Sequence, residues 1–303
     1  MRIVVHGQKA FAKELLERLL ERGESIVAVC SAPSEEGKLE DPLVDLAREN
    51  NLPVHQLSSW RTPEALALMK SFNADLCMMA YVLLLIPEPV LNAPRIGTFQ
   101  YHPSLLPYHR GPSSISWPIA MGETRTGLSI FWPDEKLDEG PVLITKSCEI
   151  GPDDTLKNVY FDKLFPMGIE AMLESLDLVK AGVVLKYKQD LKAGSYESWF
   201  TKDLVQINWE NHIDEVYNYI RAANPAPGAW SKIKGQGVDI LKSAKSSTAG
   251  VPGSIIAISD VGMQIAAKGG SVFVEQVRPH GTKKLLAFDW AKETNLKEGD
   301  TFD

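Results

Sequence analysis

Residues 1–31 of this 303-residue chain read MRIVVHGQKAFAKELLERLLERGESIVAVCS, and they predict the start of the fold. A β-branched run, Ile3–Val5, is followed by apolar residues at helical spacing that stop at Gly23. A second apolar run, Ser25–Val29, comes directly afterwards. Strand, helix and strand in this order are typical of a parallel sheet whose strands are joined by helices.

The same alternation continues through the first half of the chain. The patterns predict helices over Pro42–Asn50 and Pro63–Phe72, and strands over Val54–Leu57, Leu76–Tyr81, Thr98–His102 and Leu128–Trp132. Strands that are apolar on both faces need helices on both sides. We therefore expect an α/β fold with a doubly wound, mostly parallel sheet, whose ligands bind beyond the carboxyl ends of the strands. The turn His6-Gly7-Gln8-Lys9-Ala10 lacks the G-x-G-x-x-G pattern, which argues against a nicotinamide enzyme.

The second half of the chain has a different pattern. Lys186–Ser198 is polar and is interpreted as a linker, and one more helix is predicted to end near Ala223. Turn residues then separate five short predicted strands, Val238–Leu241, Gly253–Ile258, Met263–Ala266, Ser271–Val277 and Leu285–Phe288, which favours a small β-barrel. The expected domains are residues 1–186 and 207–303, with a linker over 187–206.

Composition excludes several classes of protein. A hydrophobic fraction of 44% is too high for a largely disordered chain. A net charge of -7 argues against a protein whose main role is to bind the phosphate backbone of nucleic acids. Three separate cysteines and six histidines without metal-ligand spacing predict neither disulfides nor a metal site. Neither a signal peptide nor a membrane span is predicted, so we expect a cytoplasmic protein without membrane partners.

Two segments carry the candidate chemistry. Residues 100–111, Gln-Tyr-His-Pro-Ser-Leu-Leu-Pro-Tyr-His-Arg-Gly, leave the carboxyl end of a predicted strand, where His102 could polarise a carbonyl or move a proton. A structural histidine in a turn fits the same position. Farther along, Asp138 in the turn Leu137-Asp138-Glu139-Gly140 could orient His102 or accept a proton, although an acidic turn is often only solvated.

Together these segments resemble the folate-dependent formyltransferase family. The signature of that family is a histidine, a Ser-Leu-Leu-Pro loop, Arg-Gly and a later Leu-Asp-x-Gly, found here as His102, Ser104–Pro107, Arg110-Gly111 and Leu137–Gly140. The stretch Ile220–Trp230 extends the resemblance to nearly the whole chain. Within the family, the chain is most similar to the amino-terminal hydrolase domain of 10-formyltetrahydrofolate dehydrogenase. The resemblance implies a Rossmann-like domain followed by an OB-like barrel.

The resemblance also implies roles for particular residues. His102 would donate to the oxyanion that forms at the formyl group, and Asp138 would orient His102 and help to activate the nucleophile. Most family transferases carry Asn-x-His, whereas this chain has Gln100, which either donates to the formyl oxygen or only bonds neighbouring backbone. The folate would lie against a wall formed by Leu84, Leu85 and Ile86, with Ser104, Leu105, Leu106 and Pro107 opposite.

The implied function is release or transfer of the formyl group of 10-formyltetrahydrofolate to water or a small amine, without a metal. Three alternatives remain open: a methionyl-tRNA formyltransferase, a sugar-amine formyltransferase and a folate-binding module without catalysis. Leu204–Asp303 contains eleven basic and eleven acidic side chains. This neutral balance disfavours tRNA as the acceptor, because a domain that holds tRNA needs an excess of basic residues.

Overall fold

The structure, a computed structural model, describes residues 1–34 and 37–303. Its chain divides into two compact units, each assembled from three separate stretches. The first unit comprises Met1–Gly111, Gly127–Ser147 and Lys163–Tyr196. The second comprises Pro112–Thr126, Cys148–Asp162 and Glu197–Asp303.

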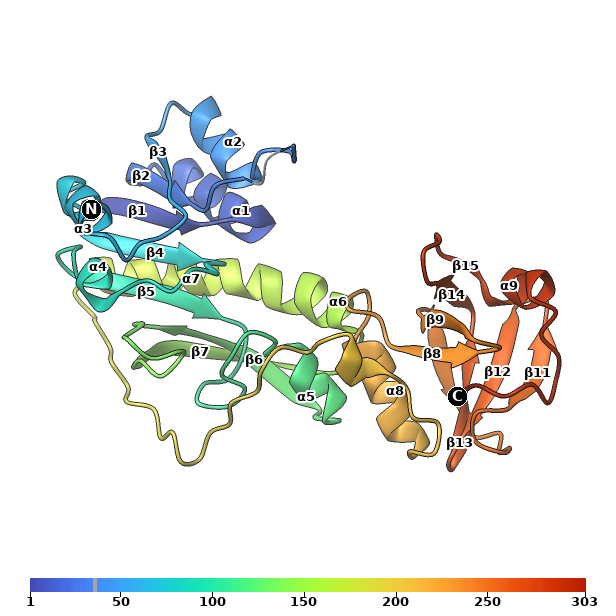
Figure 1. The fold of residues 1–303 in the computed structure, drawn as a ribbon. Coiled ribbons are helices and arrows are strands. Elements are labelled where there is room, and N and C mark those ends of the chain that lie inside the picture. The colour runs from blue at the N-terminus through green and yellow to red at the C-terminus, as the bar shows by residue number, and fades with distance from the viewer. Residues whose placement is uncertain (35–36) are drawn as a thin grey trace. The chain divides into compact units, whose positions relative to one another are not determined.

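The first unit is built around a seven-stranded sheet (Figure 1). Its strands are β1 (Arg2–Gly7), β2 (Ser25–Ser31), β3 (Val54–Gln56), β4 (Leu76–Ala80), β5 (Gly97–His102), β6 (Arg125–Phe131) and β7 (Val142–Glu149). They lie in the order β3-β2-β1-β4-β5-β6-β7. In this order, each of the first five strands, β3, β2, β1, β4 and β5, is parallel to its neighbours among them, and β6 runs antiparallel to β5. The carboxyl ends of β1, β4 and β5 therefore meet at one edge.

Helices cover both faces of this sheet, because the side chains of each strand alternate between the faces. Val5 and Met78 pack with α1 (Lys9–Glu21), α2 (Pro42–Glu49) and α7 (Phe165–Lys180). Val4 and Met79 pack on the other side with α3 (Pro63–Ser71) and α4 (Glu88–Leu91). The doubly wound arrangement that the sequence predicts is confirmed.

Gly7, the last residue of β1, is required by close packing rather than by a phosphate-binding loop. A Cβ on Gly7 would lie 2.1 Å from the carbonyl oxygen of Ala80, so close packing against β4 requires glycine. The backbone N–H of Lys9 donates to both carboxylate oxygens of Asp41, at 3.0 Å each. A protein carboxylate thus occupies the start of α1, where a dinucleotide-binding domain holds a phosphate.

The chain between Asp154 and Lys180 is not one continuous α-helix. It contains α6 (Leu156–Asn158), a π-helical segment over Val159–Leu164 and the 16-residue α7. Within the described ranges, 1–34 and 37–303, no helix combines the length and apolar composition that crossing a membrane requires.

Besides α6, the second unit contains two short antiparallel sheets and three further α-helices. The helices are α5 (Ser116–Ala120), α8 (Ile213–Ala222) and α9 (Ala287–Glu293). The strands are β8 (Trp230–Ile233), β9 (Gln236–Ile240), β10 (Ser243–Ser246), β11 (Ile255–Ser259), β12 (Gly262–Ala267), β13 (Gly270–Val274), β14 (Gln276–Pro279) and β15 (Leu285–Leu286). The sheet orders are β10-β13-β12-β11 and β15-β14-β9-β8. A strand-rich antiparallel domain after the parallel sheet confirms the predicted fold class.

Two strand predictions in this unit need correction. Ser271–Val277 was expected to be one strand, but the chain changes sheets at Glu275, between β13 and β14. Leu285–Phe288 was also expected to be a strand, but only its first two residues pair and α9 begins at Ala287. Both errors arise because apolar runs of this length do not show which partner they pack against.

A buried arginine joins the three stretches of the second unit. The Arg221 guanidinium donates to the carbonyl oxygens of Gly151 and Asp154, at 3.3 and 3.1 Å, and to that of Ile119 at 3.5 Å. Burial lowers the pKa of Arg221, which is 5% exposed. Residues that are distant in the sequence are thus held by one side chain on α8.

Candidate active site

His102 is the last residue of β5 and is 6% exposed. Its Nε2 atom lies 3.0 Å from the carbonyl oxygen of His109, and its Nδ1 atom lies 3.6 Å from Oδ1 of Asp138. Because a carbonyl oxygen only accepts, the contact with His109 assigns a proton to Nε2. The distance to Asp138 is longer than a normal hydrogen bond. A proton on Nδ1 would be held between the ring and the carboxylate, so the pair can store and transfer a proton.

Asp138 is held in place by its own turn. Its backbone adopts the left-handed conformation (φ +57°), which asparagine and aspartate tolerate better than most residues. Its Oδ2 atom accepts a hydrogen bond from the backbone N–H of Gly111 at 2.9 Å, and the side chain is 5% exposed. The sequence alternative of a solvated acidic turn does not describe this residue.

Gln100 lies on the same face of β5 as His102, as the two-residue period of a strand predicts. In the sheet it is directly opposite Met79 of β4 and Phe131 of β6. It lines a hollow that Met79, Phe131 and Asp138 also line. Its amide is therefore placed within the same pocket as the carboxylate of the His102–Asp138 pair.

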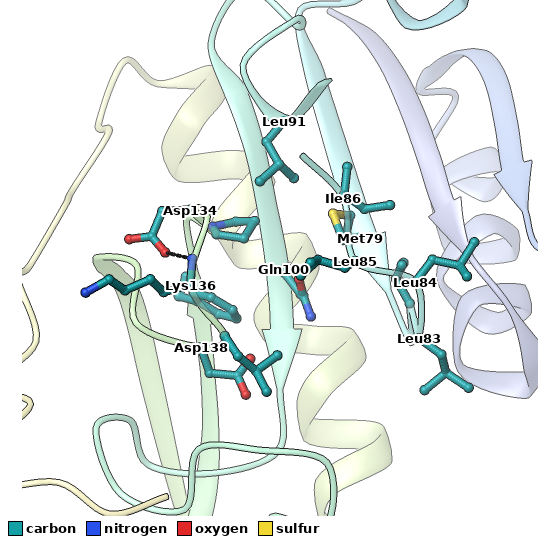
Figure 2. A pocket seen from close by; sticks show the side chains of 14 residues that line it. Met79, Leu83, Leu84, Leu85, Ile86, Leu91, Gln100, Asp134, Lys136 and Asp138 are labelled. Carbon is teal, nitrogen blue, oxygen red and sulfur yellow. Dashed lines mark hydrogen bonds between the residues drawn. The ribbon is translucent and has the colours of Figure 1, made fainter. Parts of the chain in front are cut away.

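This hollow has a volume of about 140 Å³ and two different walls. Residues 82–86, which follow β4, form an apolar wall that includes Leu84, Leu85 and Ile86. The turn from Pro133 to Asp138 contributes most of the second wall. Figure 2 shows Leu83 and Leu84 on one side of Gln100, and Asp134, Lys136 and Asp138 on the other. A flat apolar group can lie against the first wall while polar atoms meet Gln100 and Asp138.

The loop after His102, residues 104–107, is held mainly by hydrogen bonds within the protein. Ser104 is fully buried, and its hydroxyl donates to the carbonyl oxygen of Tyr108 at 2.7 Å. Ser129 of β6 accepts from the N–H of Leu106 and donates to the carbonyl oxygen of Ser104. Leu106 is buried as well, while Leu105 and Pro107 are half-buried. None of residues 104–107 lines the hollow, and Ser104 shapes the loop.

The segment that the sequence assigns to a linker supplies two residues that sequence reasoning missed. Gln189 is buried and donates to the carbonyl oxygens of Asp138 and Gly140. Ser195 accepts from the backbone N–H of His109, and its carbonyl oxygen accepts from Arg110. No pattern in the polar stretch distinguishes these residues from their neighbours. Arg110 also pairs with Glu139 at 2.8 Å, so its guanidinium has a structural partner.

Two of the three cysteines, Cys30 and Cys77, are buried. Burial raises the pKa of Cys30 well above its usual value and that of Cys77 to about 12, so both thiols stay protonated. Among the residues that the structure describes, no group of three or more histidine, cysteine, aspartate or glutamate side chains is placed to hold a metal ion. The polar side chains that line the hollow are those of Gln100, Asp134, Lys136 and Asp138, and His102 is linked to it through Asp138.

A parallel sheet with a His–Asp pair at the carboxyl end of β5 is accompanied by clear matches to known proteins. Residues 1–175 match the formyl transferase family, and residues 200–295 match the formyl transferase C-terminal domain. The chain therefore belongs to the formyl transferase family, which confirms the resemblance seen in its motifs.

Two groups of relatives share substantial sequence with the chain. It is 34% identical over 263 residues to human mitochondrial 10-formyltetrahydrofolate dehydrogenase, covering 85% of this chain but 28% of that protein. It is 33% identical over 304 residues to methionyl-tRNA formyltransferase of Geotalea uraniireducens (strain Rf4), covering 99% of this chain and 97% of that protein. The chain thus spans less than a third of the dehydrogenases it matches.

Solved structures share the fold. HypX from Aquifex aeolicus, in complex with tetrahydrofolic acid, superposes with a TM-score of 0.72 at 20% identity, covering 99% of this chain and 48% of that chain. WlaRD, a sugar 3N-formyl transferase, superposes with a TM-score of 0.70 at 19% identity, covering 93% of this chain and 99% of that chain.

Proposed function

We propose that the chain releases or transfers the formyl group of 10-formyltetrahydrofolate, with water or a small amine as the acceptor. The observation that carries the proposal is that Gln100 and Asp138 share one hollow with an apolar wall, while Nδ1 of His102 lies 3.6 Å from the Asp138 carboxylate. Family membership and relatives named for 10-formyltetrahydrofolate support the donor. The apolar wall of Leu84, Leu85 and Ile86 suits the flat pterin ring.

The chemistry follows from these groups. The nucleophile adds to the formyl carbon, and the carbonyl oxygen becomes an oxyanion in a tetrahedral intermediate. The amide of Gln100 can donate to that oxygen, and the Nε2–H of His102 can do so once it exchanges the carbonyl oxygen of His109 for the oxyanion. Such donors are often the largest catalytic contribution. Asp138, directly or through His102, accepts the proton from the nucleophile. The bond from carbon to N10 then breaks, N10 takes a proton, and tetrahydrofolate leaves with formate or a formylated amine as the second product.

Ser104, Leu105, Leu106 and Pro107 enter this proposal as the opposite boundary of the folate site. In the structure this loop contacts β6 through Ser129, beside His102. Leu105 and Pro107 are the two of these side chains that are not buried, so contact with folate would involve them. Ser104 would act by holding the loop.

A methionyl-tRNA formyltransferase is the second candidate. The relative of that name matches along 97% of its length, and the second unit has one locally basic cluster. There Lys202, Arg278 and His280 all contact the buried carboxylate of Asp239. Lys202 and Arg278 together carry one more positive charge than Asp239 neutralises, and a phosphate contact requires such an excess. The neutral balance of the last hundred residues opposes this candidate.

One incubation tests the proposal. Purified protein is mixed with 10-formyltetrahydrofolate alone, and tetrahydrofolate and formate are measured. Release without an acceptor supports the hydrolase form, and release only with an added small amine or amino sugar supports the transferase form. Strict dependence on charged initiator tRNA, with loss of binding in Arg278→Ala, would replace the proposal with the second candidate. No turnover of the folate under any condition would leave a folate-binding module.

A further inference from the structure

Residues Tyr187–Tyr196, here called the strap, follow α7 and contact both loops that carry the candidate site. At one end, Tyr187 exchanges two backbone hydrogen bonds of 2.8 Å with Val142, just after the Asp138 turn. At the other end, Tyr196 forms a bridge with Arg110, in the loop that follows His102. The strap is polar and lacks a helix, so its position depends on these contacts.

Gln189 is the only buried residue of the strap, with 7% exposure. Its Nε2 atom donates to the carbonyl oxygens of Asp138 and Gly140, at 2.8 and 2.7 Å. Because both partners are acceptors, the orientation of the amide is determined. The two hydrogen bonds hold the turn on either side of Glu139. One of them holds the backbone of Asp138, whose left-handed conformation directs the carboxylate toward His102.

Ser195 fixes the other loop. Its Oγ atom accepts from the backbone N–H of His109 at 2.9 Å. Its carbonyl oxygen accepts from the backbone N–H and Nε of Arg110, at 3.3 and 3.1 Å. The preceding Gly194 lies so close to Pro107 that a Cβ would be 2.3 Å from that carbonyl oxygen. The strap is therefore closely packed against the loop.

The two anchored points are the two partners of His102. Ser195 holds the backbone of His109, whose carbonyl oxygen faces Nε2, and Gln189 holds the backbone of Asp138, whose carboxylate faces Nδ1. The 3.6 Å gap to Asp138 is just outside hydrogen-bonding distance, so a small displacement of the turn makes or breaks this contact.

We propose that the strap positions the His102–Asp138 pair and that Gln189 is its main positioning residue. The expected effect on turnover rests on the proposed function. The expected effect on the surroundings of the His102 ring does not, and it can be measured separately. A strap that served folding alone would change stability without changing the ring.

The experiment compares Gln189→Leu with Lys188→Ala, its exposed neighbour, in the full chain. Leucine fills a similar volume and removes both donors. Turnover of 10-formyltetrahydrofolate should fall about 10- to 100-fold in Gln189→Leu, because a misplacement of about 1 Å costs that much, while KM changes little. The ¹⁵N resonances of the His102 ring should also move, chiefly at Nδ1. Lys188→Ala should match the parent protein in both measurements.

Ser195→Ala is a second, smaller change that keeps the inference testable if Gln189→Leu does not fold. It leaves the His109 N–H without its acceptor, so the Nε2 resonance should shift more than the Nδ1 resonance. His102 resonances unchanged in a folded variant of either residue would overturn the inference. If the resonances shift but the parent protein does not act on 10-formyltetrahydrofolate, the inference stands and the proposed function fails.

Discussion

Two buried histidines on one sheet show what makes a histidine useful for chemistry. His6 of β1 and His102 of β5 are 2% and 6% exposed, and their side chains lie on the same face. The row of paired residues that crosses the sheet includes His6, Met79 and Gln100. The two histidines therefore share a fold position and a degree of burial, but they have different neighbours.

His6 has an apolar environment. Its ring packs against Trp60 with centroids 4.8 Å apart, and its Nδ1 has no hydrogen-bond partner in the described part of the chain. Burial lowers the pKa of His6 from 6.5 to about 3, so it stays neutral. His102 instead has a carbonyl oxygen at one ring nitrogen and a carboxylate near the other. Burial alone makes a structural histidine, whereas burial between oxygen atoms makes a group that can hold and pass a proton.

The largest expected effect comes from removing the polar pair. His102→Ala and Asp138→Ala should each lower turnover of 10-formyltetrahydrofolate by about 100-fold or more, the scale of one oxyanion donor or one positioned base. His6→Leu is the matched control, since it removes a histidine of equal burial. Its turnover should stay close to that of the parent protein. A folded His102→Ala protein with normal turnover would remove the distinction between the two histidines.

The second effect concerns stability and pH. The pKa of His6 is lower in the folded chain than in the unfolded chain, so unfolding takes up a proton as the pH falls below about 6.5. The contribution of neutral His6 to the free energy of unfolding is therefore complete above about pH 6.5, and it is lost as the pH falls toward about 3. Between pH 7 and pH 5 this contribution to the free energy of unfolding falls by about 2 kcal/mol.

His6→Leu tests this linkage, because leucine fills the site and does not titrate. Urea unfolding of the parent and the variant at pH 7 and pH 5 measures the difference. The variant should lose about 2 kcal/mol less than the parent over this interval. Equal losses in the two proteins would show that His6 is protonated or solvated in the folded state.

The smallest effect is expected at Gln100, which shares a row of the sheet with His6 and a strand with His102. Gln100→Leu should lower turnover about 10-fold, because one neutral donor to the oxyanion is lost, while folate binding changes little. Gln100→Asn keeps the amide on a shorter arm and should favour amine acceptors over water. Steady-state kinetics with each acceptor measure both variants. Unchanged turnover in a stable Gln100→Leu protein would assign Gln100 to backbone contacts and leave His102 as the main donor.

The local features of the chain were predictable because they depend on neighbours in the sequence. The alternation of apolar residues predicted β1 to β5, and the two-residue period placed Gln100 and His102 on one face. The motif around His102 and the turn at Asp138 also indicated the family. In each case, residues a few positions apart carry the signal.

Tertiary structure alone decided which distant segments meet. It split Ser271–Val277 between two sheets and turned a polar stretch into a strap whose Gln189 is buried. The contact of Asp138 with His102 was already expected from the motifs, and the structure added its geometry. Polar residues in an extended segment show no periodicity, and their partners are backbone groups that any sequence provides. Such contacts exist only once the sheet and its loops have packed, so the sequence identified the reacting residues and the folded chain determined how they are held.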